Sequence, residues 1–247
     1  MIKVLPVIGV VLIGIILSAC TGPEDSTAEW HANKAYELYE QGRYDEAIEE
    51  CNKAIELDPN LAMAYNNRAD AYYGLGELDL AFADCNKAIE LAPDLAEAYG
   101  NRAYAYNEKG QYYLAIADSN KAIELDPEYV GAYYSRAIAY LGLGQYDLAI
   151  ADCNKTAELD PNLAEAYYNR AYAYHSLGQL DLAITDYTKA IELDPNMMEA
   201  YGNRAVAYKE QGKKTEAIAD LETFITLTNS PEWIEMARQL IEELQSQ

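Results

Sequence analysis

The stretch AEAYYNRAYAYHSLGQLDLAITDYTKAIELDPNM, residues 164–197, contains the pattern that decides the fold. Its two halves are rich in Ala, Leu, Glu, Lys and Tyr; Gly178 separates them, and Asp194-Pro195 closes the second half. Good helix formers interrupted by a glycine and ended by Asp-Pro predict two helices joined by a short turn. The alanines at 171 and 183 would let these two helices approach closely. The segment therefore predicts a helix-turn-helix hairpin.

The same segment recurs along the chain every 34 residues. Prolines mark the period at 59, 93, 127, 161 and 195, and the six units are 28–61, 62–95, 96–129, 130–163, 164–197 and 198–229. The pattern resembles the tetratricopeptide repeat family, whose signature positions are occupied by Tyr167, Ala171, Tyr174, Gly178, Ala183, Ala190 and Pro195. Arg170 departs from that signature, where Leu is common. The resemblance implies an all-α fold, an α-solenoid wound as a right-handed superhelix, with a concave groove lined by the first helix of each unit.

The chain ends predict two further segments. Residues 230–247 open with Ser-Pro-Glu and place Trp233, Ala237, Leu240 and Leu244 on one stripe, which predicts a helix that caps the last repeat. At the other end, residues 1–19 read as a signal peptide whose apolar run, 4–17, is too short for a membrane span.

Cys20 follows Leu17-Ser18-Ala19, which resembles the lipobox of bacterial lipoproteins. The resemblance implies removal of residues 1–19, diacylation of Cys20 and a short flexible tether over 20–27. The alternatives are an uncleaved anchor or a cysteine that follows a signal peptide by chance. Thr at position 21, instead of Asp, favours the outer membrane if the host has one. The expected location is thus the extracytoplasmic surface of a membrane, within the cell envelope.

Composition excludes several functional classes. The formal charge is −23, from 41 acidic and 18 basic side chains, which disfavours nucleic acid as a partner and favours neutral or basic ligands. No nucleophile, metal-ligand set or phosphate loop stands out, so we expect no enzyme activity, cofactor or metal. Cys51, Cys85 and Cys153 share one position in their repeats, which predicts that they are buried and inert.

A charge pair recurs at positions 7 and 23 of the repeats, counting from the first residue of each unit. It predicts structural ion pairs between the two helices of a repeat or between adjacent repeats. The pairs are Arg68 with Asp84, Arg102 with Asp118, Arg136 with Asp152, Arg170 with Asp186, and Arg204 with Asp220; the first repeat has Lys34 and Glu50 instead.

Two sets of side chains on the first helices are predicted to line the groove. Asparagine recurs at position 6, as Asn33, Asn67, Asn101, Asn169 and Asn203, with Ser135 as the exception. The row resembles the asparagine ladder of peptide-binding tetratricopeptide proteins; the alternative is that the amides join neighbouring repeats. Tyrosines at positions 5 and 9 are expected to line or rim the same groove: Tyr36, Tyr104, Tyr134, Tyr168 and Tyr172.

The sequence therefore predicts a membrane-anchored scaffold that binds protein or extended peptide segments in its groove, within a cell-envelope assembly. The basic side chains that clamp a partner's C-terminal carboxylate in some family members are missing, since position 2 carries Glu in four repeats. Two other hypotheses remain open: a self-associating structural protein, and a non-catalytic subunit of an envelope enzyme complex.

Overall fold

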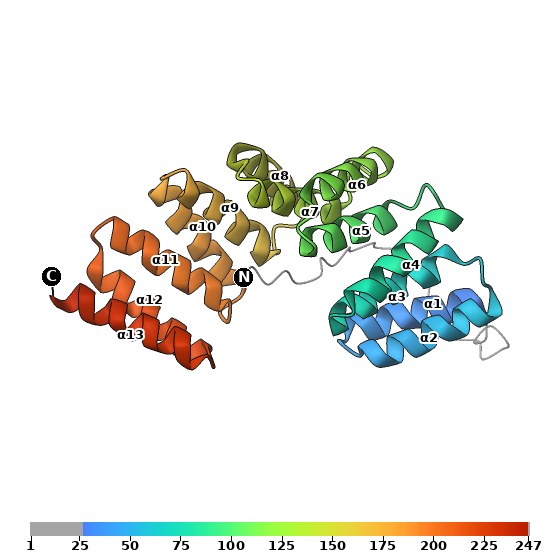
Figure 1. The fold of residues 1–247 in the computed structure, drawn as a ribbon, viewed down its shortest axis with the longest axis horizontal. Coiled ribbons are helices and arrows are strands. Elements are labelled where there is room, and N and C mark those ends of the chain that lie inside the picture. The colour runs from blue at the N-terminus through green and yellow to red at the C-terminus, as the bar shows by residue number, and fades with distance from the viewer. Residues whose placement is uncertain (1–26, 247) are drawn as a thin grey trace. The chain divides into compact units, whose positions relative to one another are not determined.

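The computed structural model describes residues 27–246, and this part of the chain forms thirteen helices and no strand (Figure 1). The helices are α1 (Ala28–Glu40), α2 (Tyr44–Leu57), α3 (Ala62–Leu75), α4 (Leu78–Leu91), α5 (Ala96–Glu108), α6 (Tyr112–Leu125), α7 (Val130–Gly142), α8 (Tyr146–Leu159), α9 (Ala164–Ser176), α10 (Leu180–Leu193), α11 (Met198–Glu210), α12 (Lys214–Leu227) and α13 (Pro231–Ser246). The predicted all-α fold of consecutive helix pairs is confirmed, and the odd-numbered helices α1 to α11 are the first helices of the repeats.

Glycine and alanine set the geometry of each pair. Gly76 ends α3 with φ of 77° and ψ of 12°, the left-handed conformation that favours glycine and reverses the chain into α4. In the repeat quoted above, Ala171 and Ala183 are fully buried where α9 and α10 meet. Short side chains at these contacts allow the close helix packing that the sequence predicts.

The helices form two compact units, with the boundary between Ala139 and Tyr140 inside α7. In the N-terminal unit the pairs α1/α2, α3/α4 and α5/α6 pack in sequence, and the first helices α1, α3 and α5 also contact one another. In the C-terminal unit α8 packs on α9, and the pairs α9/α10 and α11/α12 follow. Each pair buries its apolar face against the next, as expected of this type of solenoid.

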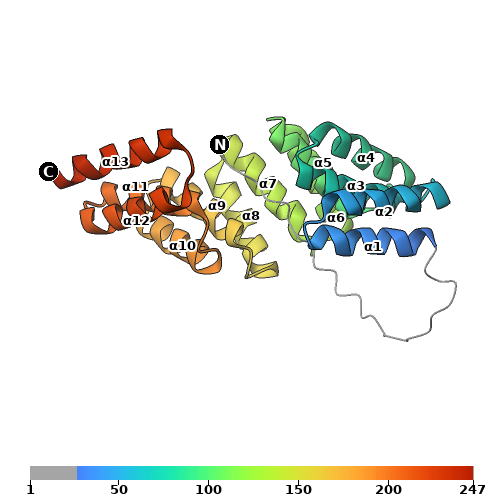
Figure 2. The ribbon, with the colours of Figure 1, turned by 90° about the horizontal axis from the view of Figure 1, so that it is seen from below.

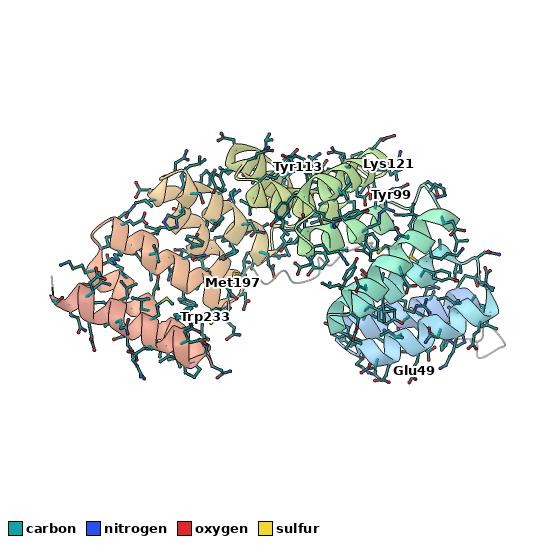
Figure 3. The ribbon with its side chains drawn as sticks, viewed as in Figure 1. Glu49, Tyr99, Tyr113, Lys121, Met197 and Trp233 are labelled. Carbon is teal, nitrogen blue, oxygen red and sulfur yellow. The ribbon has the colours of Figure 1, made fainter. Side chains whose placement is uncertain are left out.

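Helix α13 covers the last pair of the C-terminal unit (Figure 2). Ala237 and Leu244 are buried together with Leu221 of α12. Trp233, labelled in Figure 3, stacks on Phe224 with ring centroids 6.2 Å apart. The stripe identified in the sequence therefore faces α12.

Four of the arginines at position 7 each join three helices. Arg68 of α3 donates Nε and Nη2 to the two carboxylate oxygens of Asp84 on α4, at 2.7 and 2.8 Å. Its Nη1 donates to Oδ1 of Asn52 on α2, in the preceding repeat, at 2.6 Å. Arg102, Arg170 and Arg204 make the same bidentate contact with Asp118, Asp186 and Asp220, and their third donors reach Asn86, Asn154 and Thr188. We call this arrangement the arginine fork.

A tyrosine three residues earlier holds each fork in place. The guanidinium of Arg170 lies 5.3 Å from the ring centroid of Tyr167, whose hydroxyl donates to the carbonyl of Pro161 at 3.2 Å. The same stacking joins Arg68 to Tyr65 and Arg102 to Tyr99. The proline that marks the repeat period in the sequence is thus connected to the charge pair through one side chain.

The charge pair predicted for the first repeat differs from the fork. In the first repeat the expected pair of Lys34 and Glu50 is replaced, because Glu50 binds His31 at 2.6 Å and Lys34 binds Glu37. In the fourth repeat Arg136 donates to Asn120 at 2.5 Å, and Asp152 is buried. Pairing of Arg136 with Asp152 stays a prediction.

Replacing an arginine of the fork should destabilise the protein. In Arg102→Leu the nearly buried carboxylate of Asp118 loses both donors, and we expect the free energy of unfolding to fall by about 2–3 kcal/mol. Urea unfolding of the full-length chain measures this as a lower midpoint. The double variant Arg102→Leu with Asp118→Leu should recover part of the loss, because no charge is then left unpaired.

Lys121→Ala is the matched control, since Lys121 forms an exposed pair with Glu124 on α6 and should contribute at most about 0.5 kcal/mol. Equal urea midpoints for Arg102→Leu and the wild-type protein would contradict a structural role for the fork.

Candidate functional site

The asparagines at position 6 are used mainly between repeats. Nδ2 of Asn67 donates to the backbone carbonyl of Ala32 at 2.9 Å, and Nδ2 of Asn203 donates to the hydroxyl of Tyr168 at 2.9 Å. Asn101 donates to Oδ1 of Asp70 at 2.7 Å and to Oδ1 of Asn66 at 3.1 Å. Every acceptor lies on the preceding first helix, so these bonds are the repeat-to-repeat contacts that the sequence left as an alternative.

The burial of two asparagines differs from the expected exposure. Asn67 is 4% exposed and Asn169 is 1% exposed. Neither Nδ2 nor Oδ1 of the Asn169 side chain has a hydrogen-bond partner among the described residues. Asn33, in the first repeat, is exposed. For Asn67 the reason is geometric: position 6 points away from the second helix of its own repeat, but it meets the preceding first helix at the carbonyl of Ala32. Peptide binding by these amides stays a prediction.

The tyrosines separate by position. Tyr134 and Tyr168, at position 5, are 2% and 9% exposed, so they do not line an open surface as the sequence predicts. Tyr168 contacts the ring of Tyr187 at 5.9 Å between centroids, because position 5 faces inward between helices. The tyrosines at position 9 remain partly exposed: Tyr36, Tyr104 and Tyr172.

Cys20 and the predicted signal peptide lie outside the described residues. Within residues 27–246, no helix combines the length and the apolar character needed to cross a membrane. Cys51, Cys85 and Cys153 are buried free thiols, and burial raises the pKa of Cys51 to about 12. A thiol in this environment is a poor nucleophile.

A small pocket opens in the N-terminal unit, on the side of its first helices. Its volume is about 20 Å³. Side chains and backbone from α3, α5, the residue before α7 and α7 itself line it: Asp70, Tyr73, Gly100, Asn101, Tyr104, Tyr129, Gly131 and Ser135. We call it the Asp70 pocket. Only Asn101 and Tyr104 of this set are among the binding residues predicted from the sequence.

Asp70 is an unusual residue for its place in the repeat, and its carboxyl group lines this pocket. It occupies position 9, where the other five repeats have Tyr36, Tyr104, Ile138, Tyr172 and Val206. Burial of the carboxyl raises its pKa to about 8; the amide of Asn101 opposes that rise, and the negative charges of Glu97 and Glu40 add to it. The substitution at position 9 was the sequence signal for this site, but its significance depends on which side chains surround it.

Tyr129 shapes the other wall of the pocket. It stands at the last position of its repeat, where the neighbouring repeats have Leu95 and Leu163. A Cβ atom at Gly100 would lie 2.3 Å from Cε1 of the Tyr129 ring, and one at Gly131 would lie 2.7 Å from its Cζ. The ring therefore fits only because both positions are glycine. Burial is the largest cause of the raised pKa of the Tyr129 hydroxyl, and the negative charge of Asp70 is the second.

Comparison with protein families gives one result across most of the chain. One tetratricopeptide repeat profile matches residues 62–95, 130–163 and 164–197. A second repeat profile matches residues 35–76 and 103–144, and a third matches residues 85–117 and 186–219. Together these matches extend without a gap from residue 35 to residue 219. No curated protein matches the sequence significantly.

Solved structures of the same type resemble the chain. YrrB, described as a tetratricopeptide repeat protein with an unusual peptide-binding site, is 27% identical with a TM-score of 0.57, over 76% of this chain and 97% of YrrB. TTC0263 of Thermus thermophilus is 25% identical with a TM-score of 0.62, over 73% and 98%. Cut9, in the Cut9–Hcn1 complex of the APC/C, has a TM-score of 0.81 at 18% identity, over 90% of this chain and 44% of that one, and supports the fold alone.

The ionisation of Asp70 should lower stability as the pH rises. Its folded-state pKa of about 8 lies above the value of about 3.9 in an unfolded chain, so the folded protein binds the proton more tightly. The carboxyl therefore costs folding free energy progressively between about pH 4 and pH 8. Asp70→Asn removes this cost, and urea unfolding should show its stability advantage over the wild-type protein growing from pH 5 to pH 8.

Asp79→Asn is the control, because Asp79 is an exposed carboxylate whose pKa is lowered by its hydrogen bond with Lys109. That variant should gain no such advantage in this pH range. A constant difference between Asp70→Asn and wild type from pH 5 to pH 8 would mean that Asp70 ionises normally.

Proposed function

Because the chain contains tetratricopeptide repeats over residues 35–219, we propose that it is a non-catalytic scaffold that binds protein or peptide segments on the exposed face of its first helices. The similarity to YrrB, whose structure is described by its peptide-binding site, supports this class of ligand. The position-9 tyrosines carry the proposal, since Tyr36, Tyr104 and Tyr172 stay partly exposed while positions 5 and 6 are largely packed between repeats.

The chemistry of this face favours neutral or basic segments. Tyrosine combines a large contact area with a hydroxyl group and has few rotatable bonds, so little side-chain entropy is lost on binding. Glu97 at position 2 and Glu40 at position 13 add negative charge near Asp70, and the whole chain carries a charge of −23. Acidic ligands would be repelled.

The lipobox-like sequence before Cys20 supports a location for the scaffold. We place the protein on the extracytoplasmic surface of a membrane, held by diacylated Cys20, and in an outer membrane where the host has one. Residues 21–27 could extend at most about 25 Å, so the repeats would work close to the lipid surface. An anchored scaffold at that distance suits a cell-envelope assembly.

Changing the position-9 tyrosines should release bound partners. We expect full-length Tyr36→Ala with Tyr104→Ala, expressed in bacterial membranes, to recover cross-linked partner proteins at least tenfold less than wild type. Quantitative mass spectrometry of the cross-linked material measures the recovery. Tyr113→Ala is the matched control, because Tyr113 is 74% exposed on α6, a second helix (Figure 3).

Unchanged recovery by the double variant, with loss in Tyr113→Ala, would move the binding surface to the second helices. Unchanged recovery in both variants would contradict binding through tyrosines at either position.

Lipidation should depend on Cys20 alone. Cys20→Ser should abolish incorporation of labelled palmitate in a bacterial host and move the protein from the detergent phase to the aqueous phase of Triton X-114. Cys51→Ser, at a buried thiol of α2, should keep the label. Labelled Cys20→Ser protein would rule out this anchor.

A further inference from the structure

Three departures from the repeat pattern meet at the Asp70 pocket. Asp70 replaces a larger aromatic or aliphatic side chain at position 9, Tyr129 replaces Leu, and glycines at 100 and 131 make room for the Tyr129 ring. Packing alone does not require the ring of Tyr129, since Leu95 and Leu163 occupy the equivalent position in the neighbouring repeats. The convergence of the three departures on one cavity points to a ligand.

The charged side chains that act on Asp70 within residues 27–246 include no cation. One hydrogen bond reaches Asp70, from Nδ2 of Asn101 at 2.7 Å. The charged groups acting on it are Glu97 and Glu40, both negative. Tyr73 and Tyr129 also face the site, but the hydroxyl of Tyr73 donates instead to the backbone carbonyl of Asn101 at 2.8 Å. A ligand that brings one positive charge and several donors would stabilise the carboxylate.

Aromatic rings add a second source of cation affinity. Tyr73 and Tyr104 meet edge to face with centroids 5.1 Å apart, and both rings line the pocket beside Tyr129. A cation held against the faces of such rings gains about 0.5–2 kcal/mol, depending on how much water is removed. A carboxylate next to tyrosine rings therefore selects cations over neutral donors.

The size of the cavity decides between the two basic side chains. A volume of about 20 Å³ accommodates roughly one water-sized group. An ammonium group has that size and presents three hydrogen-bond donors, whereas a planar guanidinium carries three nitrogens and needs more space. The pocket thus favours the end of a lysine side chain over that of an arginine.

We propose that the Asp70 pocket binds the ammonium group of a lysine from a protein segment lying along the first helices of the N-terminal unit. The carboxylate of Asp70 forms the ion pair, the tyrosine rings surround the ammonium, and Asn101 orients the carboxylate. This inference rests on the proposed function for the source of the lysine, but the pocket's preference for an ammonium group can be measured separately.

The test uses the protein as expressed in bacterial membranes and extracted with detergent, labelled with ¹³C-aspartate, and N-acetyl-lysine methylamide as the probe. The carboxyl resonance of Asp70 is identified by its absence in Asp70→Asn. We expect the probe at tens of millimolar to lower the pKa measured for Asp70 by at least one unit, with affinity rising from pH 6 to pH 8 as the carboxyl ionises. N-acetyl-arginine methylamide and the ε-acetylated lysine amide should leave it unchanged.

Tyr129→Leu is the second variant, because Leu occupies that position in the neighbouring repeats and should preserve folding. This variant should bind the lysine probe at least fivefold more weakly than the wild-type protein does. The ratio of its affinities for the lysine and arginine probes should also fall. An equal response to both probes in the wild-type protein would overturn the size argument, and no response to lysine would overturn the proposal.

The same variants separate this inference from the proposed function. If Asp70→Asn keeps full partner recovery while the tyrosine double variant loses it, the scaffold function stands and the lysine site is wrong as a partner contact. If the wild-type protein responds to the lysine probe but recovers no partner, the pocket stands and the scaffold function fails.

Discussion

The arginine fork is the interaction on which the arrangement of the repeats depends. One guanidinium has enough donors, held in a rigid plane, to bind a carboxylate with two of them and an amide or hydroxyl with another. In Arg68 this connects α3 to its own second helix through Asp84 and to the preceding second helix through Asn52. The fork therefore sets both the spacing within a repeat and the spacing between repeats, which apolar contacts between alanines specify less sharply.

Fixing position 7 has consequences for its neighbours on the same helix. Positions 5 and 6 are turned towards the adjoining first helix, where Asn67 reaches the carbonyl of Ala32 and Asn203 reaches Tyr168. Their side chains are then used in stacking the repeats. Position 9 lies about one helical turn from position 5, and Tyr36, Tyr104 and Tyr172 keep a partly exposed side there. Variation at position 9 therefore changes the surface as well as contacts with the neighbouring repeat, such as the bond from Asn101 to Asp70.

The sequence was enough to predict the repeat period, the helix pairs and the pairing of an arginine with an aspartate in the same repeat, because each depends on residues within one repeat. The structure shows this pairing for Arg68, Arg102, Arg170 and Arg204. The burial of Asn67, Asn169, Tyr134 and Tyr168 could not be predicted in this way. A helical wheel gives the direction of a side chain relative to its own helix, but not the distance to the next one. The recurring asparagine at 52, 86, 120 and 154 was visible as a pattern, but only the third donor of each arginine gives it a role.

The Asp70 pocket shows how a repeat fold can acquire a specific site at low cost. Stability in such arrays is close to a sum of terms within each repeat and between adjacent repeats, so a change at position 9 of one repeat acts only on that repeat and its neighbours. The carboxyl comes from the second repeat and the aromatic wall from the end of the third, so neither repeat contains the pocket alone. Asp70 has a raised pKa because burial and the charges of Glu97 and Glu40 oppose its ionisation. The ionised carboxyl lowers the stability of the folded protein. A cation that enters the pocket removes this destabilisation, and the free energy regained favours binding. A residue that weakens the scaffold as the pH rises is therefore well placed to recognise a cationic ligand.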